Sequence, residues 1–547
     1  MEKRLILAIV LSFLVLVLYQ AIFLRNRPQP EPKAQPQTPA GQEEAAPAFK
    51  PPEAKEESLP SLPAEVEEAR AQAEEQVVVE TSLYQAVWSN RGASLQTWRL
   101  KTHQDENGEE LELVSSRAAQ AGKYPFFLET QDADLDQAAN ESLYLPSVSR
   151  LSLRDGEQGE VKFYYSDGNT IKIEKVFVFT GGSYAFDVRI NVWKEGREVE
   201  PRLVWGPGIS NPVLSDKRQQ FAGGRGVAVL AANKVYRLDE RKVKPETGAV
   251  NFIDWAAYED NYMAALFLTP AQQGNARIQK EGGDQQTAFF FLSVSRPERA
   301  YIGPKESDRL REFGHGAKKI INFGFFGAIA EILLVSIKSI YKFIPNWGFS
   351  IIILTLLIKI LFFPLTYSST KSMAKMQELQ PKIKALRAKY KKAKQDISQR
   401  RQMNEEMMRL YKEHGINPAG GCLPILIQIP VFWGFFRLLV VAIEFRQSPF
   451  ILWIKDLSVK DPYYVTPILM GVTQFISQKM TPTSADPTQA RMMLIMPVIM
   501  TVFFMNFQSG LVLYWLTNNV LQIGQQYIMN RMMGKKKREE HGKRRKK

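Results

Sequence analysis

The sequence predicts a multi-domain membrane protein: a polytopic α-helical bundle of six transmembrane helices joined to a β-sandwich domain outside the membrane. Three observations support this prediction. The chain of 547 residues contains seven long apolar stretches, and about 20 apolar residues in a helix span the hydrocarbon core of a bilayer. Residues 81–312 instead alternate between apolar and polar side chains. The positive charge is concentrated in two blocks beside apolar stretches, as is typical of cytoplasmic segments.

The first 80 residues predict a membrane anchor followed by a spacer. Residues 1–27 contain an apolar run at about 5–24 with basic residues on both sides, and "YQAIFLRN" offers no small-x-small cleavage site, which favours an uncleaved anchor over a signal peptide. Residues 28–80 contain ten Pro and carry twelve Glu against four Lys and Arg, a net charge of −8. This composition buries too little apolar surface to fold, so we expect a disordered Pro/Glu-rich spacer.

Residues 81–312 predict the β-sandwich. In "YAFDVRINVW", Phe186 and Val188 fall on one face while Asp187 and Arg189 fall on the other, as in a half-buried strand. "TIKIEKVFVF" has the same alternation, and Gly-containing turns such as Asp167-Gly168-Asn169 separate the strands.

The apolar stretch within residues 313–345 determines the topology of everything after it. If it crossed the membrane, and the N-terminus lay inside, both basic blocks would lie outside, against the positive-inside rule. One helical face of this stretch carries Glu331, Lys338 and Lys342. This pattern favours an amphipathic helix that lies on the non-cytoplasmic surface of the same membrane. This interpretation leaves six spans and places both termini in the cytoplasm.

The helical core is predicted at 346–533, followed by a basic cytoplasmic tail at 534–547. Its five spans are expected at about 347–366, 421–443, 464–480, 492–507 and 510–529. The two basic blocks, residues 369–418 (thirteen Lys and Arg, five acids) and 531–547 (ten and two), each carry a net charge of +8. Because these blocks flank apolar spans, we interpret them as orientation signals rather than as a nucleic-acid site.

A cytoplasmic helical hairpin is predicted at 370–415. Apolar residues recur every three or four positions in both arms. Pro381 predicts a bend in the first arm, and Asp396 is a suitable N-cap for the second.

Lys359 is the most informative single residue. It lies inside an apolar span, where a Lys costs roughly 2.5 to 3.5 kcal/mol on insertion scales, so we expect it to face a polar cavity. Thr355 lies one turn away on the same face, and later spans contribute Gln428, Asn518 and Gln522. The alternative is that the long side chain reaches the cytoplasmic surface. A second cation, Arg437, is expected to reach the outer surface or to pair with Glu444.

The sequence gives little support for catalysis. It contains one Cys and four His, and no Ser/His/Asp, HExxH or Walker arrangement. We therefore expect no enzyme activity, no cofactor and no metal site.

Five segments carry a resemblance to a known family: "NWGFSIIILTLLIKILFFPLT", "SMAKMQELQPKIKAL", "NPAGGCLPILIQIPVF", "DPYYVTPILMGVTQFISQKM" and "MPVIMTVFFMNFQSGLVLYW". Together they closely resemble the YidC/Oxa family of membrane protein insertases, over about residues 320–530. The anchor, the spacer and the outer domain match the Gram-negative form of that family more loosely. The resemblance implies a cell inner membrane protein with a periplasmic β-domain similar to sugar-mutarotase folds, and an insertase core of five helices.

The resemblance also implies roles for individual residues. The implied hydrophilic intramembrane groove carries a positive charge, and the resemblance assigns Lys359, Thr355, Tyr514 and Trp515 to it. The polar residues Gln428, Asn518 and Gln522 of the later spans complete the predicted groove. A hydrophobic slide on the third and fifth spans corresponds to Phe432, Phe436, Met496, Met500 and Phe503. The ribosome or targeting contacts in the tail are Lys535, Lys536, Lys537, Arg538, Arg544 and Arg545.

The predicted function is insertion and folding of integral membrane proteins, alone or with the Sec translocase. The expected partners are nascent membrane proteins, the Sec translocase, the ribosome or signal-recognition machinery, and the lipid bilayer. Two alternatives stay open from the residues alone: a secondary transporter that uses Lys359, and an envelope scaffold whose β-domain binds a glycan. The transporter would require an internal repeat and an acidic partner near the midplane, and neither is visible in the sequence.

Overall fold

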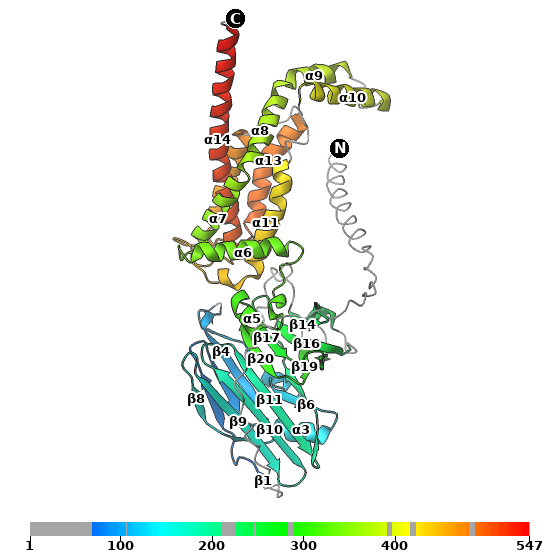
Figure 1. Cartoon of the computed structure of the whole chain (residues 1–547), viewed down its shortest axis with the longest axis vertical. Coiled ribbons are helices and arrows are strands. Elements are labelled where there is room, and N and C mark those ends of the chain that lie inside the picture. Colours follow the sequence, from blue (N-terminus) through cyan, green and yellow to red (C-terminus); the bar gives the residue numbers. More distant parts are fainter. Residues whose placement is uncertain are drawn as a thin grey trace, which may run out of the picture. The chain divides into compact units, whose positions relative to one another are not determined.

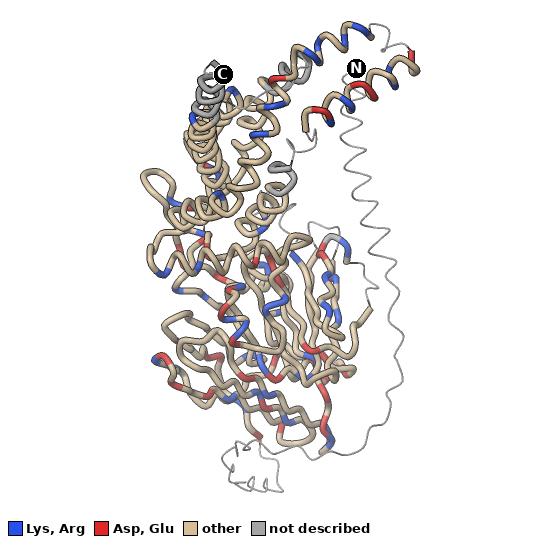
Figure 2. Tube along the Cα trace, turned by 45° about the horizontal axis from the view of Figure 1, so that its top comes forward, with Lys and Arg blue, Asp and Glu red and all other residues tan. Residues whose placement is uncertain are grey.

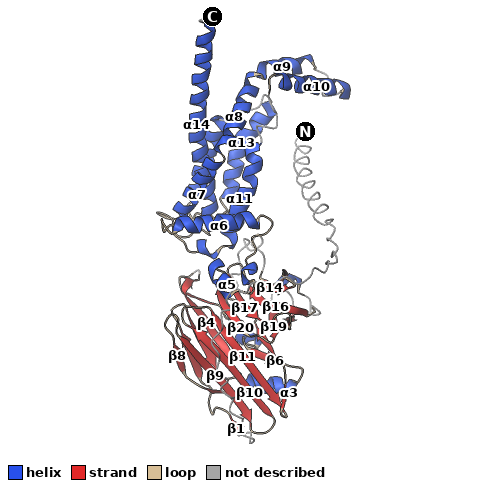
Figure 3. Cartoon of the chain, in the orientation of Figure 1, coloured by secondary structure: helices blue, strands red, loops and turns tan. Residues whose placement is uncertain are grey.

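The computed structural model describes residues 68–105, 107–210, 225–243, 248–282, 288–390, 396–415, 423–480 and 487–545. All of these residues fall within one compact unit, Glu65–Lys547. The predicted anchor at 1–27 and the spacer up to residue 67 lie outside the described residues. Strands dominate the chain up to about residue 304, and helices dominate the rest (Figure 3).

The large sheet of the β-domain has fifteen strands. Its main path runs in the order β1-β9-β10-β11-β20-β17-β16-β18-β19-β13-β6, and β7, β12, β14 and β15 pair beside it. The strands are β1 (Glu68–Ala69), β6 (Phe127–Glu129), β7 (Leu145–Pro146), β9 (Gln158–Asp167), β10 (Ile171–Thr180), β11 (Ala185–Lys194), β12 (Arg197–Glu198), β13 (Arg202–Trp205), β14 (Gly226–Ala231), β15 (Lys234–Asp239), β16 (Val250–Glu259), β17 (Met263–Leu268), β18 (Gly274–Glu281), β19 (Phe289–Ser295) and β20 (Arg299–Pro304).

A second sheet has five strands in the order β5-β4-β3-β2-β8. They are β2 (Gln76–Glu80), β3 (Tyr84–Ser89), β4 (Ser94–Gln104), β5 (Glu110–Glu112) and β8 (Arg150–Ser152). The short helices of the domain are α2 (Ala118–Ala121), α3 (Ala133–Glu141) and the 3₁₀ turn η1 (Glu240–Lys242). The expectation that the spacer runs to Glu80 is therefore corrected, because β1 and β2 lie within it and pair with other strands. The β-branched run Val77-Val78-Val79 explains why β2 forms.

Aromatic side chains form the contact between the two sheets. Trp88 of β3 is stacked on Phe177 of β10 with ring centroids 4.4 Å apart, and it meets the edge of Phe126 at 4.7 Å. Trp98 of β4 is stacked on Phe186 of β11 at 5.5 Å. All five side chains are buried. The alternation in "YAFDVRINVW" therefore matches a strand with one face turned to this shared core.

The described β-domain buries three charged side chains, Lys175, Glu259 and Lys305, and the last two form an ion pair. Lys175 of β10 is fully buried, and its Nζ donates to the carbonyl oxygens of Gly92 (2.6 Å) and Phe126 (2.8 Å). Burial lowers the pKa of Lys175 from 10.5 to about 7, because desolvation disfavours the charged form.

This burial predicts a pH-dependent stability. Between pH 7 and about 10 the unfolded chain holds a proton at Lys175 that the folded chain does not, so the free energy of unfolding rises with pH in this window. The slope is at most about 1.4 kcal/mol per pH unit. We expect thermal unfolding of the full chain, followed by tryptophan fluorescence, to show this rise between pH 7 and 9, and Lys175→Met to remove it. Equal slopes in the two proteins would contradict the prediction.

The helical part begins with α5 (Ser307–Phe313), the 3₁₀ turn η2 (Ala317–Ile320) and α6 (Gly327–Tyr341). The bundle and its hairpin follow as α7 (Trp347–Leu361), α8 (Phe363–Glu378), α9 (Gln380–Lys389), α10 (Ile397–Glu413), α11 (Leu423–Val441), η4 (Ile443–Phe445), α12 (Val465–Met480), α13 (Pro487–Phe504) and α14 (Ser509–Arg545). α6 packs on α7 and α11 and runs across their ends (Figure 1). α6 therefore lies crosswise to the helices that it contacts, and its location at a membrane surface stays a prediction.

The predicted span 347–366 is not one straight helix. α7 ends at Leu361 and α8 begins at Phe363, and the two helix axes differ by 60°. Pro364 in the first turn of α8 accounts for the break, because its ring nitrogen has no N–H to continue the helical hydrogen bonding.

Within the described residues, no single helix combines the length and the apolar composition needed to cross a bilayer. Taken together, the bent pair α7 and α8 is long and apolar enough to cross a bilayer. Two shorter segments, Gln428–Val441 and Leu494–Phe504, are also apolar helices.

The helical hairpin predicted at 370–415 has the expected internal packing. Leu379 and Ile383 are buried against Met407 and Leu410 of the returning arm. α8 and α9 are separated at Leu379, just before Pro381, and the Asp396 side chain caps α10 by accepting from the Ser398 N–H at 2.8 Å. The hairpin carries many charged residues of both signs, whereas the bundle helices carry few (Figure 2).

Candidate functional site

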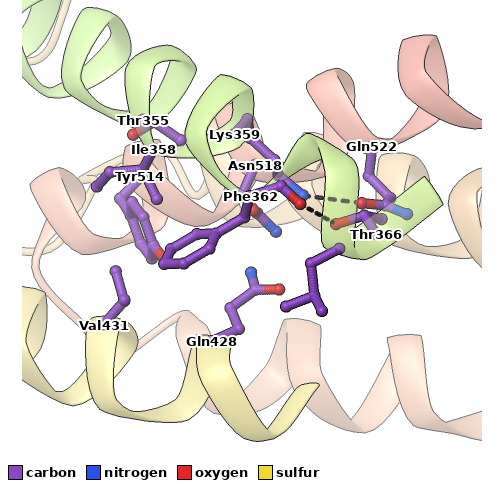
Figure 4. A pocket seen from close by; sticks show the side chains of 11 residues that line it. Thr355, Ile358, Lys359, Phe362, Thr366, Gln428, Val431, Tyr514, Asn518 and Gln522 are labelled. Carbon is purple, nitrogen blue, oxygen red and sulfur yellow. Dashed lines mark hydrogen bonds between the residues drawn. The ribbon is translucent and has the colours of Figure 1, made fainter. Parts of the chain in front are cut away.

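A cavity of about 50 Å³ lies between α7, α8, α11 and α14. Its eleven lining residues are Thr355, Ile358, Lys359, Phe362, Leu365, Thr366, Gln428, Val431, Tyr514, Asn518 and Gln522. Since one water needs about 10 to 15 Å³ of such space, the cavity has room for a few water molecules. Figure 4 shows these side chains converging from the surrounding helices.

Helical spacing places the polar groups in two facing stripes. Tyr514, Asn518 and Gln522 recur every four residues on α14, so they lie on one face. Thr355 and Lys359 have the same spacing on α7. α7 is held in position at its start by the Asn346 cap and by Gly348.

The local geometry at the start of α7 requires both Asn346 and Gly348. The Asn346 side chain accepts from the Phe349 N–H at 3.1 Å, which satisfies one of the free donors of the first turn. A Cβ on Gly348 would lie 2.0 Å from a ring carbon of Phe450, so only glycine allows this close approach of α7 to the loop after α11.

Lys359 bridges the two stripes. Its Nζ donates to Gln522 Oε1 at 2.8 Å across the cavity (Figure 4). Among the eleven described lining residues there is no Asp or Glu. The ammonium group therefore has a neutral partner and no carboxylate in this cavity, which leaves its charge available to an incoming acidic group.

The other polar groups differ in what they offer. Thr355 is almost fully buried, and its hydroxyl donates to the Ile351 carbonyl at 2.7 Å, so its oxygen can still accept. Tyr514 is buried with its ring stacked on Phe435 at 4.2 Å. Gln428 of α11 faces the same space with its amide (Figure 4). The cavity thus has donors and acceptors on three sides between apolar walls.

Six of the seven residues predicted for the groove line this cavity, and Trp515 does not. Its ring packs against Phe432 at 5.0 Å and Phe504 at 5.4 Å, and its Nε1–H donates to Gln474 Oε1 at 3.3 Å. Trp515 is one residue past Tyr514, so the helix turns it by about 100° toward α12 and α13.

Sequence reasoning missed Ile358, Phe362, Leu365, Thr366 and Val431. Phe362 and Thr366 lie three and seven residues after Lys359, so continued helical spacing would have found them. The bend at Phe362 keeps both of them against the cavity.

The residues predicted for the hydrophobic slide divide into two groups. Met496 and Phe503 of α13 are exposed on the outside of the bundle, and Met500 between them is half-buried. Phe436 is only 7% exposed and packs on Trp433 and Phe507, and Phe432 packs on Phe504 and Trp515. The assignment of Phe436 to an exposed slide is therefore wrong.

From Gln428 onward, the exposed apolar side chains of α11 are Ile429 and Trp433, one turn apart. On α13 the exposed apolar residues among the described side chains are Leu494, Ile495, Met496, Val498, Ile499, Val502 and Phe503. The basic tail residues Lys535, Lys536, Lys537, Arg538, Arg544 and Arg545 continue the backbone of α14, and their side chains lie outside what the structure describes.

Arg437 and Glu444 do not form the expected pair. Glu444 binds Lys338 of α6 at 2.7 Å, and Lys338 also binds Asp308 of α5 at 2.9 Å. Arg437 Nη2 donates to the Asn322 carbonyl at 2.6 Å. Each group thus meets a residue more than 100 positions away, which sequence spacing does not reveal.

Two family models and several named relatives match this chain. The family model described as 60Kd inner membrane protein matches residues 339–537, and the YidC periplasmic domain model matches residues 76–335. A relative from Syntrophus aciditrophicus (strain SB), named Membrane protein insertase YidC, is 37% identical over 97% of this chain and 100% of its own. A relative of the same name from Citrifermentans bemidjiense is 38% identical over 97% of this chain and 99% of its own.

One solved structure is that of an active YidC insertase with its first transmembrane domain resolved. It covers 85% of this chain and 95% of its own, with 20% sequence identity and a TM-score of 0.37.

Proposed function

This chain belongs to the YidC family of membrane protein insertases, and we propose that it carries out insertion through the cavity around Lys359. The family is an inner membrane insertase with a periplasmic domain. These relatives are named as insertases, which gives no support to a secondary transporter or a glycan-binding scaffold. The single observation that supports the proposed site is the Lys359 ammonium group, whose hydrogen-bond partner among the described residues is a neutral amide within a largely apolar cavity.

The physical problem of insertion is the polar tail of the client. A nascent segment with a polar outer tail must pass through hydrocarbon, where each unsatisfied polar group costs several kcal/mol. The cavity supplies hydrogen-bond partners along part of that path, from Asn518, Gln522 and Gln428 and from a few waters. Lys359 attracts acidic residues of the tail, so the polar segment exchanges water for protein groups rather than for lipid.

The apolar stretch of the client leaves by another face. In our proposal it moves into lipid along the exposed side chains of α13 and the Ile429 and Trp433 stripe of α11. These side chains are as apolar as lipid tails. The client's transmembrane segment therefore keeps its apolar surface out of water as it passes from the protein surface into lipid.

The membrane placement is part of the proposal. The N-terminal anchor and five core segments form six spans, α6 lies at the periplasmic surface, and both termini face the cytoplasm. The hairpin α9–α10 and the basic tail hold the ribosome or the signal-recognition machinery close to the cavity, and the Sec translocase is a partner for longer clients.

Reconstitution tests the proposed function. Vesicles that contain only the purified chain should insert a single-span client with a short acidic outer tail, without nucleotide or other proteins, because the cavity lowers the barrier and lipid burial supplies the driving force. Protease protection of the tail inside the vesicles measures insertion. Protein-free vesicles are the control, and equal protection in both would contradict the proposal.

A further inference from the structure

The most exposed aromatic side chain of the described β-domain is Phe252, which is 71% exposed. It lies near the start of β16, where the pairing with β18 shifts register between Asn251 and Ile253. Its φ of +58° is in the left-handed region, which is unfavourable for a bulky side chain. A bulge that turns a large apolar side chain into solvent, at the expense of backbone strain, indicates a surface that binds something apolar.

Phe252 lies beside the turn between β14 and β15. Ala231 at the end of β14 pairs with Ile253, so the turn residues Ala232 and Asn233 lie at the same end of the sheet as Phe252. Tyr236, two residues into β15, is 48% exposed, and the ammonium group of Lys234 lies 5.2 Å from its ring centroid.

The segment before α6 is attached to this turn. Lys319 of η2 is exposed, and its Nζ donates to the backbone carbonyl of Asn233 at 3.2 Å and to the Asn233 side chain. Arg237 Nη2 donates to the Ile320 carbonyl at 2.8 Å. The turn therefore carries a second lysine and is tied to the chain that leads into the bundle.

These contacts place the turn close to the outer ends of the bundle helices. Asn322 follows Lys319 by three residues, a distance of at most about 10 Å. Its carbonyl accepts from Arg437, four residues before the end of α11. α6 begins at Gly327 and exposes Ile332 (66%) and Val335 (57%), so the apolar surface continues from this region along α6.

We propose that Phe252, Tyr236, Lys234 and Lys319 form a lipid-contact edge, by which the β-domain rests on the outer leaflet of the inner membrane. Aromatic rings favour the boundary between headgroups and hydrocarbon. The two lysines match the negative phosphates of anionic lipids. The inference rests on the membrane placement given above, and it adds a bilayer contact outside the six spans.

The single cysteine of the chain makes a depth measurement possible. In the full chain with Cys422→Ser, nitroxide labels are placed one at a time at Phe252→Cys, at Phe503→Cys on α13 and at Leu145→Cys on β7. The labelled proteins are reconstituted in nanodiscs of phosphatidylethanolamine and phosphatidylglycerol. Collision rates with oxygen, which dissolves in lipid, are compared with those of a water-soluble nickel chelate. Leu145 is 42% exposed and its strand pairs with β9, several strands away from β16.

We expect the label at 252 to collide more with oxygen than with nickel, as at 503 but at a shallower depth, while the label at 145 shows the reverse. Replacing Lys234 and Lys319 together by Gln should shift the label at 252 toward the aqueous values. A label at 252 that resembles the one at 145 overturns the inference. Low collision rates with both reagents also overturn it, because they indicate a protein partner or a second copy. If the label at 503 is aqueous too, the membrane placement itself has failed.

Discussion

Lys359→Ala is expected to reduce insertion of a single-span client with an acidic outer tail by at least about tenfold. The variant removes the positive charge of the cavity, and a hydrogen bond to a charged group contributes about 1.5 to 3 kcal/mol, where 1.4 kcal/mol corresponds to a factor of ten. Lys359→Arg should retain most of the activity, because it keeps the charge although its planar fork has a different geometry. The measurement is protease protection of the client tail in reconstituted vesicles.

The control for Lys359→Ala is a second client whose outer tail has Asn and Gln in place of its acidic residues. Its insertion should change little in the variant, because no charge attraction is lost. Normal insertion of the acidic client by Lys359→Ala would disprove the charge role. An equal loss for both clients would instead indicate that the variant disturbs the bundle.

Trp88→Ala is expected to destabilise the β-domain by about 3 to 5 kcal/mol, the usual cost of truncating a fully buried large aromatic side chain. Trp88 is 0% exposed and lies between Phe126 and Phe177, so its loss leaves a cavity between the two sheets. Urea unfolding of the full chain, followed by the fluorescence of the remaining tryptophans, measures the change.

Trp88→Phe provides the matched control. Among the described residues, the indole Nε1–H of Trp88 has no hydrogen-bond partner. Phe keeps most of the apolar volume and removes that unsatisfied donor, so its effect should be much smaller than that of Ala. A loss below about 1 kcal/mol for Trp88→Ala would contradict the assignment of this side chain to the core.

Much of the candidate site could be predicted from the sequence, because polar residues inside apolar helices are conspicuous. Thr355, Lys359, Asn518 and Gln522 each carry polar atoms that are costly to leave in lipid, and helical spacing alone places them on common faces. Their arrangement around one cavity depends on how the helices pack, and this packing cannot be predicted from spacing along one helix.

The errors have equally physical causes. Apart from Gln428 and Arg437, the side chains of α11 are apolar on all sides, so its sequence does not distinguish the buried Phe436 from the exposed Trp433. Glu444 binds Lys338 rather than Arg437 because tertiary packing, not spacing along one helix, brings charges together. The break at Phe362 had a local signal in Pro364, which the length of the apolar run concealed.

Part of the β-domain fold could also be predicted from the sequence, and part could not. Alternating patterns identified β10 and β11, where one face of each strand is buried. β2 was missed because it follows a segment whose Pro and Glu content is typical of disorder, although Val77, Val78 and Val79 favour a strand. The order of twenty strands in two sheets depends on long-range pairing and is beyond local patterns.

The central claim, that the cavity around Lys359 receives the polar tail of the client, is tested most directly by photocrosslinking during insertion. A photoreactive residue is placed at Gln428, which lines the cavity, and at Tyr527, which is 60% exposed on α14 and lies outside the cavity lining. A short single-span client is then translated as a stalled nascent chain. The account predicts that the acidic tail is captured at position 428 and not at 527. Insertion that proceeds without capture at 428, or with equal capture at both positions, would contradict it.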